Sequence, residues 1–193
     1  LSSRIGLAPD RFVVGEGIDG LLGLVVRLVV SHDTPVVTSL GAYPTFNYHV
    51  AGFGGRLVTV PYRDDREDME ALLETVQREN APLVYLANPD NPMGSWHGAE
   101  AIIEFARSLP ETTLLVFDEA YCEFAPEGAL PSIEALADMP NVIRFRTFSK
   151  AYGLAGQRIG YGFGTAGTVS RFDRVRNHFG VNRMAQVAAV AAL

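Results

Sequence analysis

Short apolar runs rich in β-branched residues alternate along the whole chain with longer segments whose apolar residues recur at helical spacing. The short runs predict buried strands, and the longer segments predict amphipathic helices. The expected strands are Phe12–Val14, Pro35–Thr38, Arg56–Val60, Leu83–Ala87, Thr113–Phe117, Val142–Arg146 and Arg158–Phe163. The expected helices are Ile18–Val30, Glu67–Glu79, Ala99–Ser108, Val169–Arg176 and Met184–Leu193. This alternation is typical of an α/β fold, here a mostly parallel seven-stranded sheet with helices on both faces, in three layers.

Polar, glycine and proline residues follow the predicted strands at three places. These are GEG (Gly15–Gly17), NPDNPMG (Asn88–Gly94) and DEAY (Asp118–Tyr121). Open α/β sheets bind their ligands beyond the carboxyl ends of the strands. We therefore expect the functional site to be built from these loops.

Composition and charge narrow the class of protein. The 193 residues are 48% hydrophobic and 20% charged, which suits one packed domain over residues 1–193. A formal charge of −6 argues against binding to nucleic acid or anionic lipid. The longest apolar stretch, Leu21–Val30, is shorter than the roughly 20 residues of a membrane span. The single cysteine, Cys122, cannot form an intrachain disulfide, so we expect a reducing, cytoplasmic setting.

Two further patterns suggest functions that the rest of the sequence does not support. GFGTAG (Gly162–Gly167) matches a dinucleotide-binding fingerprint, but that fingerprint also needs a carboxylate about 20 residues later, and no Asp or Glu follows Asp173. The histidines lack the i, i+4 spacing of a metal site, so no metal is expected. The histidines are His32, His49, His97 and His178.

Lysine occurs once, at Lys150, so any chemistry that requires a side-chain primary amine has a single candidate. Taken singly, the loops have plain explanations: Asn-Pro steps mark turns, Asp118 can be a solvated strand end, and Lys150 can be a surface residue. Taken together, they supply an amine, a buried acid, a phenol, an amide, and hydroxyl and cationic groups for a phosphate. Pyridoxal phosphate chemistry requires that set of groups.

Three motifs in this order, NPDNPMG, FDEAY and TFSKAYGLAGQRIGY, resemble the aminotransferase class I and II family of pyridoxal-phosphate enzymes. The chain is most similar to the histidinol-phosphate aminotransferase branch, and the eight-residue spacing from Lys150 to Arg158 is specific. The resemblance covers nearly the whole chain. It implies pyridoxal 5'-phosphate as the cofactor and the large domain of fold type I, without the N-terminal arm and the smaller C-terminal domain of the family's longer chains.

The resemblance assigns a role to each matching residue. It implies that Lys150 forms the Schiff base with the cofactor and then moves a proton, and that Asp118 pairs with the pyridine nitrogen. Tyr121 and Asn91 match residues that hydrogen-bond the ring hydroxyl, and Phe46 matches an aromatic ring stacked on the cofactor. The catalytic residues that it implies are Lys150, Asp118 and Tyr121.

The resemblance also implies that the cofactor phosphate is held from two sides. Backbone N–H groups of Gly15 and Glu16 would bind it at the start of the first long helix, where the helix dipole favours an anion. The hydroxyl groups of Thr147 and Ser149 and the guanidinium group of Arg158 would complete the site.

The activity implied is that of a homodimeric aminotransferase, which exchanges an amino group between an amino acid or amino-alcohol phosphate, such as histidinol phosphate, and a 2-oxo acid. Three alternatives stay open: a decarboxylase or lyase of the same fold, such as a threonine-phosphate decarboxylase; the effector domain of a transcriptional regulator; and a domain that has lost catalysis. In the family, the arginine that grips the substrate carboxylate lies in the C-terminal domain. The matched residues therefore do not determine the amino donor.

Overall fold

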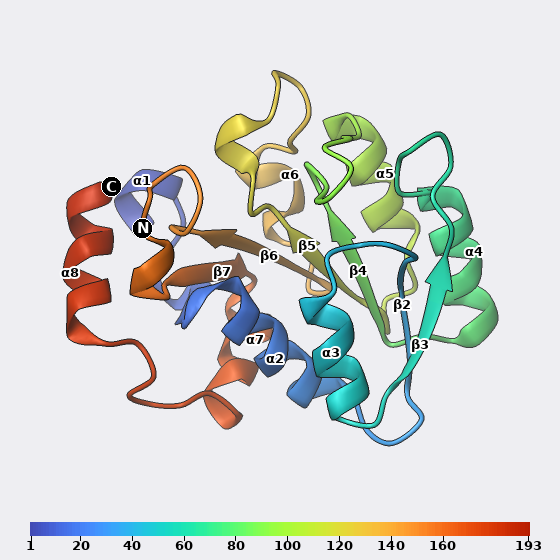
Figure 1. Ribbon diagram of the computed structural model, residues 1–193, viewed down its shortest axis with the longest axis horizontal. Helices are drawn as coiled ribbons and strands as arrows, with labels where there is room; N and C mark the ends of the chain where they lie inside the picture. Colours follow the sequence, from blue (N-terminus) through green and yellow to red (C-terminus); the bar gives the residue numbers. More distant parts are fainter.

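The computed structural model describes residues 1–193, which form one seven-stranded sheet between helices (Figure 1). The strands are β1 (Phe12–Gly15), β2 (Pro35–Ser39), β3 (Arg56–Val60), β4 (Leu83–Ala87), β5 (Leu114–Asp118), β6 (Val142–Thr147) and β7 (Gly160–Gly164). Their order across the sheet is β1-β7-β6-β5-β4-β2-β3. The strands from β6 to β3 pair in parallel, whereas β7 is antiparallel to both of its neighbours. The prediction of a mostly parallel seven-stranded sheet is confirmed.

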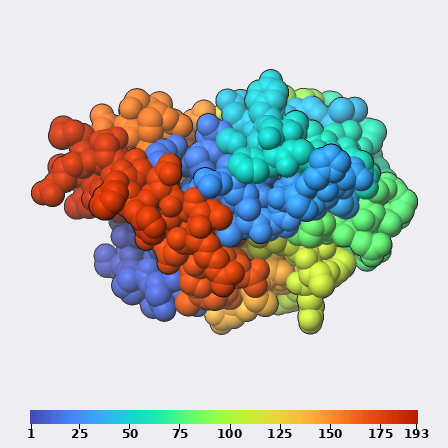
Figure 2. All heavy atoms as spheres, turned by 90° about the horizontal axis from the view of Figure 1, so that it is seen from below, coloured from blue at the N-terminus to red at the C-terminus, as the bar shows by residue number.

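Helices cover both faces of the sheet, which gives the three expected layers (Figure 1). The longer helices are α2 (Gly17–Val29), α3 (Thr45–Gly52), α4 (Met69–Glu79), α5 (Ala99–Ser108) and α8 (Arg183–Ala192), and the shorter ones are α1 (Ser2–Ile5), α6 (Ile133–Ala137) and α7 (Ala166–Ser170). α2 and α3 pack over one apolar core, and α4, α5 and α6 over another. Figure 2 shows α2, in blue, between α3 in cyan and the red C-terminal segment. None of the helices combines the length and apolar character that a membrane crossing needs.

The central strands are covered on both faces, and their sequences reflect this. Every residue of β4 is buried, and so is nearly every residue of β5. Strands buried on both faces have continuously apolar sequences, whereas strands with one exposed face alternate apolar and polar residues. A polar side chain within such a strand must therefore find a hydrogen-bond partner inside the protein.

Two helical segments differ from the prediction. The sequence pattern predicts no helix over Thr45–Gly52, yet α3 forms there, and its only buried residues are Phe46 and Val50. Two apolar residues one turn apart are too few to show helical periodicity. The helix expected over Val169–Arg176 is shorter, because α7 is followed by a 3₁₀ turn over Arg171–Arg174.

One edge of the sheet gathers the carboxyl ends of several strands. β4 and β5 end in register at Ala87 and Asp118, and β6 ends beside them at Thr147. β1 is antiparallel to β7, which is itself antiparallel to β6, so β1 ends at the same edge and brings the start of α2 there. A Cβ atom on Gly160 would lie 3.0 Å from the carbonyl carbon of Gly17, so the glycine permits the close approach of β7 to α2.

Candidate functional site

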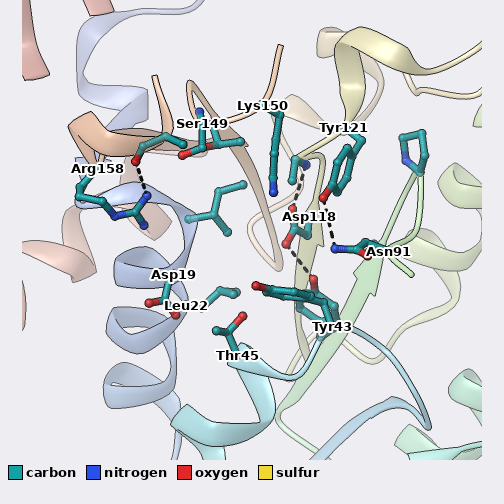
Figure 3. A pocket seen from close by; sticks show the side chains of 17 residues that line it. Asp19, Leu22, Tyr43, Thr45, Asn91, Asp118, Tyr121, Ser149, Lys150 and Arg158 are labelled. Atoms are coloured by element: carbon teal, nitrogen blue, oxygen red, sulfur yellow. Dashed lines mark hydrogen bonds between the residues drawn. The ribbon is translucent and has the colours of Figure 1, made fainter. Parts of the chain in front are cut away.

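A cavity of about 280 Å³ opens at this edge of the sheet, between the start of α2, the start of α3 and the loops after β4, β5 and β6 (Figure 3). Its volume is near the lower end of the range for small-molecule sites. Seven of the ten residues expected from the sequence line it: Asn91, Asp118, Tyr121, Thr147, Ser149, Lys150 and Arg158. The structure therefore brings together polar side chains from three separate loops.

Asp118 is the last residue of β5 and is only 7% exposed. Its Oδ2 accepts a hydrogen bond of 2.7 Å from the hydroxyl of Tyr85, and its Oδ1 accepts one of 2.9 Å from the backbone N–H of Ala120. Burial raises the pKa of the Asp118 carboxyl to about 6, while the two hydrogen bonds and the Lys150 ammonium act in the opposite direction. At neutral pH the carboxyl is therefore mainly ionised, although it is buried.

Lys150 follows β6, and its side chain points into the cavity above Asp118 (Figure 3). Its Nζ lies 5.2 Å from the centre of the Tyr121 ring, within the range of a cation–π interaction. The residue is exposed. The amine is thus available to a molecule that enters the cavity.

Asn91 and Tyr121 form a pair on the side of the cavity. The Asn91 Nδ2 donates a hydrogen bond of 3.2 Å to the Tyr121 hydroxyl oxygen. The loop that carries Asn91 is held at its base by Asn88, whose side chain donates to the carbonyl of Ala129 and accepts from the backbone N–H of His97. The hydrogen bond between Asn91 and Tyr121 fixes the direction in which the phenol presents its oxygen.

The other end of the cavity has the character of an anion site. α2 starts at Gly17, its N-cap residue makes no side-chain capping bond, and Ile18 and Asp19 of its first turn line the cavity. The first N–H groups of a helix have no partner within the helix and carry its positive dipole end. The Arg158 guanidinium lies so close that Nη2 is 2.7 Å from where a Cβ of Gly17 would be. Thr147 and Ser149 add hydroxyl groups nearby.

Two of the residues expected to hold the phosphate, Gly15 and Glu16, lie outside the cavity. Gly15 belongs to β1, where it pairs with Gly160, and it does not line the cavity. Glu16 also lies outside the cavity, and its carboxyl faces Gly180. The N–H groups at the cavity are those of the first turn of α2, which starts at Gly17. The signal that could have located it is the second glycine of GEG, whose φ of +78° suits glycine at the start of the helix.

Phe46 does not reach the cavity wall, contrary to the expectation from the sequence. It is fully buried beneath the cavity, where its ring stacks on Tyr85 with centroids 4.8 Å apart and an interplanar angle of 19°. The aromatic side chains that do line the cavity include Tyr43 and Tyr85. Sequence reasoning missed Tyr85, because within the apolar run LVYLA it is indistinguishable from a core residue.

Comparisons of the sequence with known proteins identify the family of the chain. The sequence model of the family described as "Aminotransferase class I and II" matches residues 2–193. Histidinol-phosphate aminotransferase 2 of Pseudomonas fluorescens is 38% identical over 194 residues, which cover 100% of this chain and 52% of that protein. The histidinol-phosphate aminotransferase of Moorella thermoacetica is 35% identical over 195 residues, covering 100% of this chain and 50% of that one. The chain thus spans about half the length of the curated relatives it matches.

Solved structures of other proteins share the fold of this chain. Histidinol-phosphate aminotransferase from Sinorhizobium meliloti, in complex with pyridoxal-5'-phosphate, superposes with a TM-score of 0.98 at 69% identity, over 99% of this chain and 52% of that one. The L-threonine-O-3-phosphate decarboxylase from Porphyromonas gingivalis superposes with a TM-score of 0.85 at 19% identity, over 98% of this chain and 58% of that one. The second likeness shows the fold alone. The sheet and its helices are those of the large domain of pyridoxal-phosphate fold type I.

Proposed function

Because the chain belongs to the aminotransferase class I and II family, we propose that residues 1–193 form the pyridoxal 5'-phosphate-binding large domain of an aminotransferase. The observation that carries the proposal is the cavity that Lys150, the only lysine, shares with the buried carboxyl of Asp118. The 69% identity to a histidinol-phosphate aminotransferase that holds this cofactor supports the same conclusion.

The residues of the cavity fit the cofactor group by group. A phosphate suits the start of α2, where the unpaired N–H groups of the first turn face Arg158. A pyridine nitrogen suits Asp118, which is buried and mainly ionised. An aldehyde requires a primary amine, which Lys150 supplies. A ring hydroxyl suits Tyr121, which Asn91 orients.

When bound, pyridoxal phosphate supplies an electron-withdrawing ring that stabilises negative charge on the α-carbon of an attached amino acid. The amine of Lys150 would hold the cofactor, and its Nζ is the group in the cavity that could accept a proton and donate it again. The Asp118 carboxylate would hold the ring nitrogen and favour its protonated form, since an ionised acid favours a nearby positive charge. Tyr121, whose hydroxyl is oriented by its hydrogen bond from Asn91, would hold the ring oxygen.

For the whole protein, the proposed reaction is transfer of an amino group between an amino acid or amino-alcohol phosphate, of the histidinol phosphate type, and a 2-oxo acid. The similarity to two histidinol-phosphate aminotransferases supports this substrate class. The partners proposed are these small molecules and a second copy of the chain, in a cytoplasmic homodimer, with no nucleic acid or membrane. The negative charge and the free Cys122 agree with that setting.

The test is chemical labelling of the purified chain. Pyridoxal phosphate is added, the visible absorption is recorded, the adduct is reduced with borohydride, and the labelled residue is located by mass spectrometry. We expect the label on Lys150, because it is the only side-chain amine. In the Lys150→Ala variant, the sole remaining amine is that of the N-terminus, so a label found only there in both proteins would overturn the proposal.

A product assay separates the reaction types. With histidinol phosphate as the amino donor, amino transfer consumes the 2-oxo acid and releases no carbon dioxide, because this donor has no carboxylate. With an amino acid phosphate as the substrate, release of carbon dioxide without consumption of the 2-oxo acid would identify a decarboxylase instead.

A further inference from the structure

The interior of the sheet contains a polar contact that the motifs do not reveal. Tyr85 lies in the middle of β4 and is 2% exposed. Its hydroxyl donates a hydrogen bond of 2.7 Å to Oδ2 of Asp118 on the neighbouring strand, and its side chain forms part of the cavity wall. It is the only side chain that hydrogen-bonds Asp118; the other donor, at Oδ1, is the backbone N–H of Ala120.

The position of the phenol is set by packing from a distant part of the chain. Phe46 of α3 stacks on the Tyr85 ring with a centroid separation of 4.8 Å, and Phe46 itself is fully buried. A buried ring that stacks on another buried ring has little freedom to rotate. The hydroxyl oxygen is therefore held where Asp118 meets it, and the side chain of Asp118 is held in turn by bonds to both of its oxygens.

The other ionisable groups around Asp118 do not replace this bond. Glu119 is a neighbouring carboxylate, but Arg144 and Arg146 hydrogen-bond both of its oxygens. Glu67 reaches the same interior from the segment before α4, and it accepts bonds from the Ser39 hydroxyl and the Ala87 N–H. Lys150 attracts the Asp118 charge from the cavity side without forming an ion pair within 4.0 Å.

We propose that Tyr85 is a positioning residue, whose phenol keeps the Asp118 carboxylate ionised and turned toward the cavity. The contribution to cofactor binding rests on the proposed function, whereas the effect on Asp118 does not. A hydrogen bond donated to the ionised form of an acid favours that form, and the phenol donates such a bond inside a wall where burial disfavours the charge. Tyr85 thereby makes a buried charge available at the base of the cavity.

The first experiment measures the pKa of Asp118 in the cofactor-free chain by carbon-13 NMR of labelled aspartate, with the signal assigned from the Asp118→Asn variant. In Tyr85→Phe we expect this pKa to rise by about one unit or more, because a bond to the charged form is lost while the ring and its stacking remain. The matched control is Tyr62→Phe, which removes a hydroxyl donated to Asp90 outside this cavity and leaves Asp118 unchanged.

The second experiment follows the affinity for pyridoxal phosphate as a function of pH. Binding that needs ionised Asp118 weakens as the pH falls through the pKa of that group. In Tyr85→Phe the whole profile is expected to move to higher pH by the amount by which the Asp118 pKa rises, and affinity at the wild-type midpoint is expected to fall about fivefold for a rise of one unit. A purely structural defect would weaken binding equally at every pH.

The outcomes separate the inference from the proposed function. An Asp118 pKa in Tyr85→Phe within about 0.3 unit of wild type would overturn the inference, whether or not Lys150 is labelled by the cofactor. A raised pKa without any cofactor binding would leave the inference in place and reject the proposed function. If Tyr85→Phe does not fold, 3-fluorotyrosine at position 85, a stronger hydrogen-bond donor, is expected to lower the Asp118 pKa, and no change would count against the proposal.

Discussion

Asp118 and Lys150 face one cavity from the ends of neighbouring strands, yet no contact within 4.0 Å joins the carboxylate to the ammonium. The charge of Lys150 nevertheless lowers the pKa of Asp118 across the space between them. Two opposite charges that attract without pairing leave both groups free to contact a ligand that enters between them. The separation therefore leaves room for a ligand between the carboxylate and the amine.

Replacing Lys150 by arginine or by alanine distinguishes the effect of its charge from the effect of its primary amine. Lys150→Arg keeps a positive charge but has no primary amine that can anchor the cofactor. We expect both Lys150→Arg and Lys150→Ala to lose amino-transfer activity by about 10²–10⁴-fold or more. The Asp118 pKa should rise in Lys150→Ala and stay nearer to wild type in Lys150→Arg, which NMR titration can measure. Equal shifts in the two variants would mean that the charge of Lys150 does not act on Asp118.

We expect Glu67 to make the free energy of unfolding depend on pH. It is 2% exposed, and burial raises the pKa of its carboxyl from an ordinary value of 4.5 to about 8. The folded state thus binds this proton more tightly than the unfolded state, so the stabilisation is complete below about pH 4.5 and is lost as the pH rises to about 8. The free energy of unfolding should fall over that window by no more than about 5 kcal/mol from this group.

The variant that tests this is Glu67→Gln, which keeps the shape of the side chain and cannot ionise. In urea unfolding at several pH values, the free energy of unfolding should vary less with pH in Glu67→Gln than in wild type. The control is Glu70→Gln in the same segment, whose side chain is 74% exposed and whose replacement should leave the slope as it is. A slope that is unchanged in Glu67→Gln would assign the pH dependence to other groups.

Gly17 is the residue that brings the start of α2 close to Arg158. Its φ is +78°, and a Cβ there would lie 2.7 Å from Nη2 of Arg158. Gly17→Ala should cost about 1–2 kcal/mol of stability and displace the guanidinium, so that affinity for pyridoxal phosphate falls about tenfold. Gly167→Ala in α7 is the control, because its nearest neighbouring atom is 3.9 Å away. Calorimetry that finds equal affinity in both variants would contradict this account.

Glu119 balances two buried arginines beneath the cavity. It is fully buried, and it contacts Arg144 at 2.6 Å and Arg146 at 3.0 Å. Glu119→Gln leaves those positive charges uncompensated and should reduce the free energy of unfolding by about 3–5 kcal/mol. The exposed Glu111→Gln should stay close to wild type in the same denaturation experiment.

Much of the site could be predicted from the sequence because its groups follow strands. Asp118 ends a run of apolar residues, and Lys150 lies in a loop with Ser149 and Arg158, so both positions can be located from local pattern alone. The parallel sheet then brings those strand ends to one edge. The wider fold followed in the same way from the alternation of strands and helices.

Other positions depended on contacts between distant segments. Between Phe46 and Tyr85 the chain forms β3 and α4, yet the two rings stack in the core. Nothing in the local sequence shows that α3 would turn Phe46 away from the cavity, because α3 itself has too weak a periodicity to be predicted. The helix expected from Ile18 starts at Gly17, and the phosphate was assigned to the N–H groups of Gly15 and Glu16 just before it, since helix boundaries depend on backbone geometry at single glycines.

The sequence by itself determined the class of the fold, the edge of the sheet at which the site lies, and the single amine that the chemistry can use. These follow from periodicity, from the order of the motifs and from the single occurrence of lysine. Only the tertiary structure decided that Tyr85 meets Asp118, that Phe46 lies behind them and that Gly17 opens the anion site. Local sequence patterns indicate which face of a helix or strand is apolar. Which side chains meet across neighbouring strands is set by strand register and by packing.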